Sequence, residues 1–267
     1  MASSLITESC WNASTARSRA HLVLPRPPTP SASSETGRVG LLAYLASRSW
    51  LSRVRRGLYT AVPLGASSPG DWHEDPWVVA VKTFAPCYIG GWSACEHWEL
   101  TEQMFRDVVV FTAQSTRSAE KQVQGTTFRL RHRPESLHFG TRAVWRNRTR
   151  VAVSDPSRTI ADILDSPELG GGIRHVADII VEYFSGEHTK VRDLVEYLDR
   201  LGNRTAFKRL GYILESIGMV SDIVPLCRER ISKGLSALDP TVAQPGRISK
   251  RWNLRINVRL NTESPSR

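Results

Sequence analysis

Residues 50–63 read WLSRVRRGLYTAVP and carry the strongest indication of the fold. Gly57 supplies the permissive backbone that a tight turn needs, so the pattern predicts a short β-hairpin. The apolar residues that can face a small core are Leu51, Val54, Leu58 and Val62. The basic residues that then project outward are Arg53, Arg55 and Arg56. The segment therefore has the character of a basic wing that contacts DNA.

The residues just before this hairpin favour a helix. Residues 38–48 read RVGLLAYLASR, with Val39, Leu42, Ala43 and Ala46 at helical spacing. A helix that runs into a basic hairpin describes the second half of a winged helix-turn-helix, with residues 35–48 as its recognition helix. The expected DNA contacts are Arg38, Arg48, Arg53, Arg55 and Arg56.

An alternative interpretation is an ordinary hairpin with a solvated basic edge, because basic side chains commonly protect exposed strands from edge-to-edge pairing. The local charge favours the DNA interpretation. No acidic residue occurs between Glu35 and Asp71, so nothing nearby in the sequence neutralises the arginines. Such a face attracts phosphate.

Composition narrows the class of protein. The chain has 267 residues, 40% of them hydrophobic, and a formal net charge of +10, which favours nucleic acid, a membrane surface or an acidic protein as partner. Residues 155–229 contain 13 acidic and 9 basic residues, so the basic excess lies on either side of them. The four cysteines form no disulfide framework, and no apolar run approaches the roughly 20 residues that span a bilayer. We expect a cytoplasmic protein that does not enter a membrane.

The patterns along the chain predict an α+β protein: a small N-terminal winged helix-turn-helix, then a larger mixed α/β domain with a helical C-terminal layer. Residues 1–36 are rich in Ser, Thr, Ala and Pro and are expected to be disordered or degenerate. The winged-helix unit covers 37–64 and a linker covers 65–76. In the larger domain, 77–154 is the α+β part, 155–235 the helical part and 252–260 a closing strand. Expected elements include a helix over 92–100, strands over 108–112, 126–131 and 144–153, and a helix that starts at Asp155 and Pro156.

A second basic cluster lies between Arg129 and Arg150, which span seven arginines and a single acid. The alternating spacing predicts that each of two trios lines one face of a sheet. The trios are Arg129, Arg131 and Arg133, and Arg146, Arg148 and Arg150. The alternatives are a solvated outer face and a surface that binds RNA or an acidic protein, because arginine pairs with phosphate and carboxylate alike.

Catalytic and metal-binding patterns are weak. Asp107 and Glu120 come nearest to the clustered carboxylates of a nuclease, and Cys87, Cys95 and His97 match no zinc spacing. Gly170 to Gly172 lack the lysine and hydroxyl of a phosphate-binding loop. We expect no enzyme activity, metal or cofactor.

Several separated segments together resemble one family, the AbiEi-like antitoxins and transcriptional regulators of bacterial type IV toxin-antitoxin systems. The resemblance covers roughly residues 38–257. Its pieces are WLSRVRRGLYTAVP at 50–63, YIGGWSACEHWELTEQ from Tyr88, VAVSDPSRTIADILDSPELGGGI from Val151, KRLGYILESIG from Lys208 and RWNLRINV from Arg251.

The resemblance implies two activities. One is repression of the chain's own operon by binding promoter DNA, and the other is neutralisation of a nucleotidyltransferase toxin, for which a stable complex with the toxin is not required. The chain departs from the family pattern at its start, because residues 1–33 show no clear first helix. Two alternatives therefore stay open beside the antitoxin and autorepressor. One is a nucleic-acid-processing enzyme with a basic substrate-binding sheet, and the other is an antitoxin or interaction module that has lost DNA binding.

Overall fold

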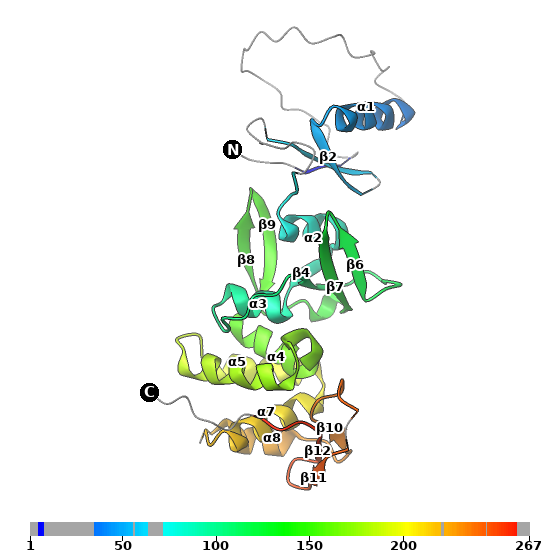
Figure 1. The fold of residues 1–267 in the computed structure, drawn as a ribbon. Coiled ribbons are helices and arrows are strands. Elements are labelled where there is room, and N and C mark those ends of the chain that lie inside the picture. Colours follow the sequence, from blue (N-terminus) through cyan, green and yellow to red (C-terminus); the bar gives the residue numbers. More distant parts are fainter. Residues whose placement is uncertain are drawn as a thin grey trace.

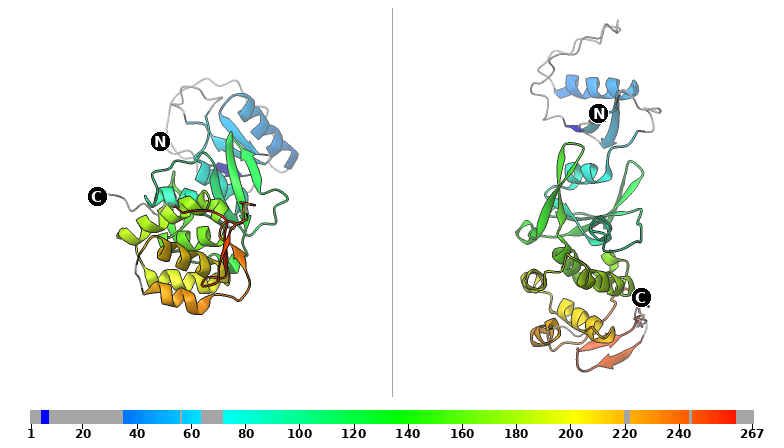
Figure 2. Two further views of the ribbon diagram at one scale, coloured as in Figure 1. Left: turned by 60° about the horizontal axis from the view of Figure 1, so that its bottom comes forward. Right: turned by 90° about the vertical axis from the view of Figure 1, so that its left-hand side faces the viewer.

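The computed structural model describes residues 5–7, 35–55, 57–63, 72–219, 222–243 and 245–260. It is a mixed α/β structure whose parts follow one another along a long axis (Figure 1). A helix and small sheet lie at one end, a six-stranded sheet in the middle, and helices with a second small sheet at the other end. The side view in Figure 2 shows the same three tiers.

The first tier is one helix packed on a three-stranded sheet of order β1-β3-β2. Its elements are β1 (Leu5–Thr7), α1 (Glu35–Ser47), β2 (Leu51–Arg55) and β3 (Leu58–Ala61). The predicted helix and hairpin are confirmed. Within residues 1–36, which were expected to be disordered or degenerate, Leu5–Thr7 form β1 and Glu35 and Thr36 belong to α1, whereas residues 1–4 and 8–34 lie outside the described residues.

The hairpin buries both of its faces, which corrects the expectation of one small core. Leu51 and Tyr59 pack with Leu42 of α1, whereas Val54 and Leu58 pack against the second tier. A register shift between Arg53 and Arg55 accompanies this arrangement. On α1 the buried side is Leu42 with Leu45 and Ala46, while Val39 is 47% exposed, so part of the predicted apolar face was wrong. The wing is thus held between α1 and the larger part of the protein.

The second tier is a mixed sheet of order β6-β7-β5-β4-β9-β8. Helix α2 covers one face, where Val79 and Phe84 meet Val110 and Phe128. Trp92, Phe105 and Leu169 cover the other face. The elements are α2 (Pro76–Phe84), β4 (Cys87–Ile89), α3 (Gly91–His97), β5 (Val108–Thr112), β6 (Glu120–Val123), β7 (Thr126–His132), η2 (Glu135–Leu137), β8 (Thr141–Arg146) and β9 (Thr149–Ser154).

Residues 144–153 form parts of two strands, not one. Asn147 and Arg148 have φ values of 47° and 70°, the backbone of a two-residue turn with positive φ at both positions. The chain therefore reverses between Arg146 and Thr149, which are register partners. Helix α3 and strands β5 and β7 lie where the sequence predicted them, whereas α2, β4 and β6 were missed.

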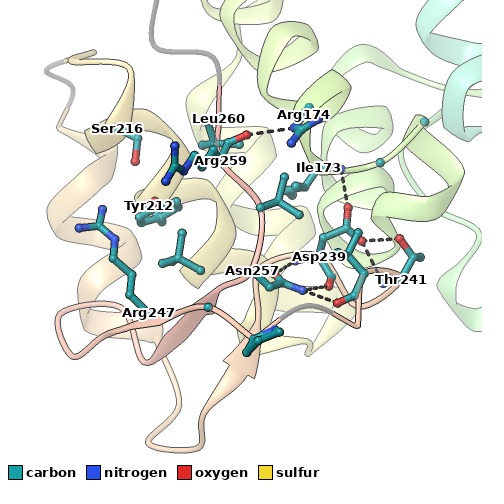
Figure 3. Close-up of a pocket in the computed structure, with 17 residues that line it drawn as sticks. Ile173, Arg174, Tyr212, Ser216, Asp239, Thr241, Arg247, Asn257, Arg259 and Leu260 are labelled. Carbon is teal, nitrogen blue, oxygen red and sulfur yellow. Dashed lines mark hydrogen bonds between the residues drawn. The ribbon is translucent and has the colours of Figure 1, made fainter.

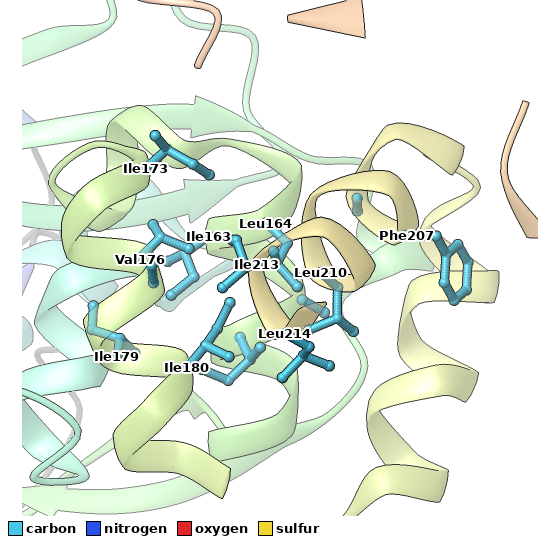
Figure 4. Close-up of a cluster of buried hydrophobic side chains, with 14 of the residues drawn as sticks. Ile163, Leu164, Ile173, Val176, Ile179, Ile180, Phe207, Leu210, Ile213 and Leu214 are labelled. Atoms are coloured by element: carbon cyan, nitrogen blue, oxygen red, sulfur yellow. The ribbon is translucent and has the colours of Figure 1, made fainter. Parts of the chain in front are cut away.

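The third tier is a bundle built around α4 (Pro156–Asp165). Asp155 accepts a hydrogen bond from the Arg158 amide and Pro156 occupies the first turn, which confirms the predicted helix start. Its apolar side chains pack with α5 and α7, as Figure 4 shows for Ile163 and Leu164. The remaining elements are η3 (Pro167–Gly170), α5 (Ile173–Ser185), α6 (Val191–Leu201), α7 (Arg204–Ser216), α8 (Ile223–Arg230), β10 (Ser236–Ala237), β11 (Arg247–Ser249) and β12 (Leu254–Ile256).

The predicted closing strand is shorter than expected, because only Leu254–Ile256 of residues 252–260 are β-strand. Trp252 is buried, and a side-chain carbon at Gly211 of α7 would lie 2.1 Å from its ring. The close approach of this indole to the α7 backbone fixes the last strands on the bundle. Among the described residues, no helix is both long and apolar enough to cross a membrane.

Candidate nucleic-acid interface

The first tier exposes one arginine just after α1 and one on the hairpin. Arg48 follows α1, and its guanidinium lies 5.6 Å from the centre of the Tyr44 ring. Arg53 is exposed on β2, opposite Tyr59 in the register. Neither arginine has a carboxylate partner among the described residues. The side chains of Arg38, Arg55 and Arg56, which the sequence also predicted to contact DNA, lie outside the described part of the chain.

A buried carboxylate ties the wing to the second tier. Glu74 accepts hydrogen bonds from the Thr60 hydroxyl of β3, at 2.9 Å, and from the Asn147 amide of the β8–β9 turn, at 3.2 Å. The side chain of Gln124, in the β6–β7 turn, donates to the Ser52 hydroxyl at 3.0 Å. Two hairpin turns of the central sheet therefore anchor the wing.

The β8–β9 hairpin places its arginines in three directions, which corrects the prediction that Arg146, Arg148 and Arg150 line one face. Trp145 is the register partner of Arg150, so these two side chains share a face. Arg146 faces the opposite side, where its guanidinium lies 4.6 Å from the centre of the Trp77 ring. Arg148 lies in the turn. The prediction assumed one extended strand, in which every second side chain lies on the same face. The two-residue turn interrupts that strand, so the alternation does not continue through it.

This hairpin exposes an unusual combination of side chains on one face and in the adjoining turn. Trp145 is 69% exposed, and its neighbours Arg148 and Arg150 are exposed as well. The described residues provide no ion-pair partner for either arginine. We call Trp145, Arg148 and Arg150 the hairpin patch. An exposed tryptophan beside unpaired arginines is a composition typical of binding surfaces.

The other predicted trio is occupied within the protein. Arg129 forms ion pairs with Asp107, at 2.9 Å, and with Glu120. Arg131 lies 3.8 Å from Glu168 of η3. Arg129 and Arg131 share a strand face as predicted, but Arg133 does not, because β7 ends at His132. The prediction that all three residues line one face was therefore wrong for Arg133, whereas Arg129 and Arg131 remain 40% and 50% exposed beside their acidic partners, and their role in binding stays a prediction.

Arg133 belongs to a buried network that joins the central sheet to the bundle. Its guanidinium lies 3.0 Å from Asp165 and 3.4 Å from Asp162. Asp162 also accepts from Arg158, at 3.1 Å, and from the Tyr88 hydroxyl, at 3.0 Å. Arg158 and Asp162 are fully buried, and burial raises the pKa of Tyr88 well above its ordinary value. The network therefore joins the sheet to α4 through charges that are buried or nearly so.

The geometry also bears on the weak catalytic patterns. Asp107 and Glu120, the nearest approach to nuclease carboxylates, both bind Arg129. Burial raises the pKa of Cys87 to about 12, so this thiol is protonated at neutral pH. Within the described residues, no three His, Cys, Asp or Glu side chains are grouped in a way that could hold a metal ion.

Comparison with known proteins shows the fold only. No family model matches the chain, and no characterised protein matches it in sequence. Among solved structures, it is similar to the crystal structure of the RV2827C protein from Mycobacterium tuberculosis, with a TM-score of 0.56 and 13% sequence identity. The match covers 80% of this chain and 78% of that chain. At this identity the likeness establishes a related fold and carries no statement about activity.

Proposed function

We propose that this chain is a non-enzymatic, cytoplasmic DNA-binding antitoxin that represses its own operon. The observation that carries the proposal is the unit formed by α1 and the β2–β3 hairpin, in which Arg48 and Arg53 are exposed without an acidic partner among the described residues. In the proposed complex, α1 enters the major groove, and the wing arginines contact phosphates or the minor groove.

Strand β1 supports the winged-helix part of the proposal. It pairs antiparallel with β3, so the wing hairpin is part of a three-stranded sheet. An isolated two-stranded hairpin is marginally stable in water, and a third strand with a packed helix gives independent stability. The three-stranded sheet therefore supports α1, although the sequence of residues 1–33 showed no helix that could do so.

The docking of the wing supports a defined geometry for the DNA complex. Val54 and Leu58 pack into the core of the second tier, and Glu74 bonds to Thr60. A wing held in this way does not have to be ordered when it binds, which lowers the entropic cost of association.

For the second activity, we propose that the larger part of the chain counteracts a nucleotidyltransferase toxin through the hairpin patch. Arg148 and Arg150 carry uncompensated charge beside Trp145, whereas Arg129, Arg131 and Arg133 pair with acidic residues of the chain itself. An aromatic side chain flanked by arginines suits an acidic protein surface or a nucleic-acid strand. In the proposal, the hairpin patch neutralises the toxin by binding one of these two kinds of surface. The proposal does not include a stable complex between the chain and the toxin.

The DNA-binding proposal is tested with the chain's own upstream DNA and the double variant Arg55→Ala/Arg56→Ala. Removing two phosphate-binding side chains should reduce the magnitude of the slope of log affinity against log salt by about 1.8, and should weaken binding to all sequences. Arg192→Ala on α6 is the matched control, because it removes an exposed arginine far from the wing. Unchanged binding by the double variant would contradict the wing assignment.

A growth assay with the toxin tests the second activity separately. Rescue by the wild-type chain without binding to upstream DNA would favour an antitoxin module that has lost its operator function. Metal-dependent cleavage of nucleic acid by the purified protein would instead favour a processing enzyme.

A further inference from the structure

A large groove lies in the third tier, away from the wing and the hairpin patch. It has a volume of about 1210 Å³ and is formed by the start of α5, one side of α7 and the segments around β11 and β12. Figure 3 shows Arg247 and Arg259 on the same side of the groove as Tyr212 and Ser216, with Arg174 on the other side of the Arg259 backbone. The volume exceeds the upper range of about 1,000 Å³ for sites that hold drug-sized ligands.

Hydrogen bonds fix the walls of this groove. The Asn257 side-chain amide donates to the carbonyl groups of Asp239, at 2.7 Å, and Val242, at 2.6 Å, while its oxygen accepts from the Asp239 amide. Arg174 donates to the Arg259 carbonyl at 3.1 Å. A side-chain carbon at Gly246 would lie 2.0 Å from the Ile256 carbonyl oxygen, so only glycine permits this approach. The groove is therefore preformed.

Its charge is positive. Arg174, Arg247 and Arg259 line the groove, and no carboxylate in the described part of the chain forms an ion pair with any of them. The lining carboxylate is Asp239, which accepts from the Ile173 amide at 3.0 Å and from Thr241 at 2.9 and 2.6 Å. Burial acts to raise the pKa of Asp239, but these hydrogen bonds lower it overall. Its negative charge is thus held within the wall by three donors.

We infer that this groove binds phosphate groups, with Arg247 and Arg259 as the principal ligand-binding residues and the hydroxyl groups of Tyr212 and Ser216 as further donors. A phosphate offers more acceptor oxygens than a carboxylate, so guanidinium groups from different segments can share it. Tyr212 also provides an aromatic ring in the lining, on which a nucleobase can stack. The inference is independent of the proposed DNA contacts, because none of these residues belongs to the first tier.

The test is isothermal titration calorimetry of the full chain at low salt with tripolyphosphate, a nucleoside triphosphate and a short single-stranded RNA. The variant is Arg247→Gln/Arg259→Gln, which removes both positive charges and leaves shorter polar side chains. Removing two charge-assisted hydrogen-bond donors should weaken binding of the phosphate probes by about tenfold or more. The matched control is Arg255→Gln, because Arg255 is exposed on β12 and does not line the groove.

The probes distinguish a free nucleotide from a nucleic-acid strand as the source of the phosphate, and both of these from an acidic peptide. Among the probes whose binding the double variant weakens, tighter binding of the triphosphate than of RNA identifies a free nucleotide, and the reverse identifies a nucleic-acid strand. Equal weakening by both variants would place the phosphate elsewhere on the basic surface and overturn the inference. A glutamate-rich peptide that binds the groove as tightly as tripolyphosphate would also overturn it, because the site would then recognise charge and not phosphate. Absence of binding by all phosphate probes would have the same meaning.

Discussion

Two sets of arginines lie on the same central sheet, yet their surroundings differ. Arg129, Arg131 and Arg133 face acidic residues from β6, η3 and α4 or the loops beside them, and Arg133 is buried. Arg148 lies in the β8–β9 turn and Arg150 lies on β9, and both are exposed without acidic partners among the described residues. Similar spacing in the sequence therefore leads to arginines that pair with acidic residues of the chain in one place and to arginines without such partners in the other.

The difference shows that the spacing of charges along the sequence does not reveal whether a distant segment pairs with them. The Arg133 guanidinium is compensated by residues 29 and 32 positions later in the chain. Ion pairs of this kind favour one folded structure over alternatives, whereas unpaired arginines attract negatively charged partners. We therefore expect substitutions in the first set to change stability and substitutions in the second set to change function.

The largest expected effect on stability is in the buried network. Asp162→Asn leaves the buried guanidinium of Arg158 without its carboxylate, so the free energy of unfolding should fall by about 3–5 kcal/mol. The control is Asp199→Asn, because Asp199 pairs with Arg204 and Arg230 at the surface and its replacement should cost less than about 1 kcal/mol. Chemical denaturation measures both values. Similar losses of stability in the two variants would contradict a special role for the buried network.

The hairpin patch should show the opposite behaviour. Trp145→Ala/Arg148→Ala/Arg150→Ala should abolish toxin neutralisation in a growth assay and change the free energy of unfolding by no more than about 0.5 kcal/mol, as is usual for exposed side chains. Arg129→Ala/Arg131→Ala should neutralise as well as the wild type. Loss of neutralisation by the second variant alone would reverse the comparison.

A smaller effect is expected on the salt dependence of DNA binding, and it distinguishes the arginines of the first tier from those of the central sheet. Arg48→Ala/Arg53→Ala should reduce the magnitude of the salt slope of DNA binding by about 0.9 for each phosphate group that the variant no longer neutralises. Arg129→Ala/Arg131→Ala should leave this slope unchanged, since these arginines are paired within the chain. Fluorescence anisotropy over a range of salt concentrations gives both slopes. A flatter slope in the sheet variant would show that the central sheet contacts DNA.

The smallest effect concerns pH. Burial lowers the pKa of His138 below its ordinary value of 6.5, and the nearby Arg158 and Arg133 act in the same direction. The neutral form of His138 is therefore favoured in the folded state. Its contribution to the free energy of unfolding is complete above pH 6.5 and is lost as the pH falls through the folded-state pKa. His138→Gln should make the acid-induced loss of stability shallower than in the wild type. Urea denaturation at a series of pH values measures the difference.

Local signals in the sequence predicted the parts of the fold that short-range chemistry determines. Asp155 and Pro156 predicted the start of α4, and Val108–Thr112 predicted the buried strand β5. The same signal, an N-cap aspartate before proline, occurs at Asp75 and Pro76 and was available to predict α2. The β8–β9 turn was missed because Asn147 and Arg148 adopt positive φ without a glycine to indicate it.

The candidate sites were less predictable, because they depend on long-range packing. The partners of Arg129 and Arg131 lie on other elements, and no periodicity in the sequence reports them. The groove likewise combines residues from α5, α7 and the last strands. Only the helix and hairpin of the first tier could be predicted locally, because they are contiguous in the sequence, and the DNA contacts of their arginines stay a prediction.

A salt titration of binding to the chain's own upstream DNA, compared with a scrambled duplex of equal length, separates an operator-reading repressor from a merely basic protein. We expect tighter binding to the upstream DNA at every salt concentration, with a steep salt dependence on both duplexes. Equal, salt-sensitive binding to the two duplexes would refute the repressor proposal, because the arginines of the first tier would then attract DNA without reading its sequence.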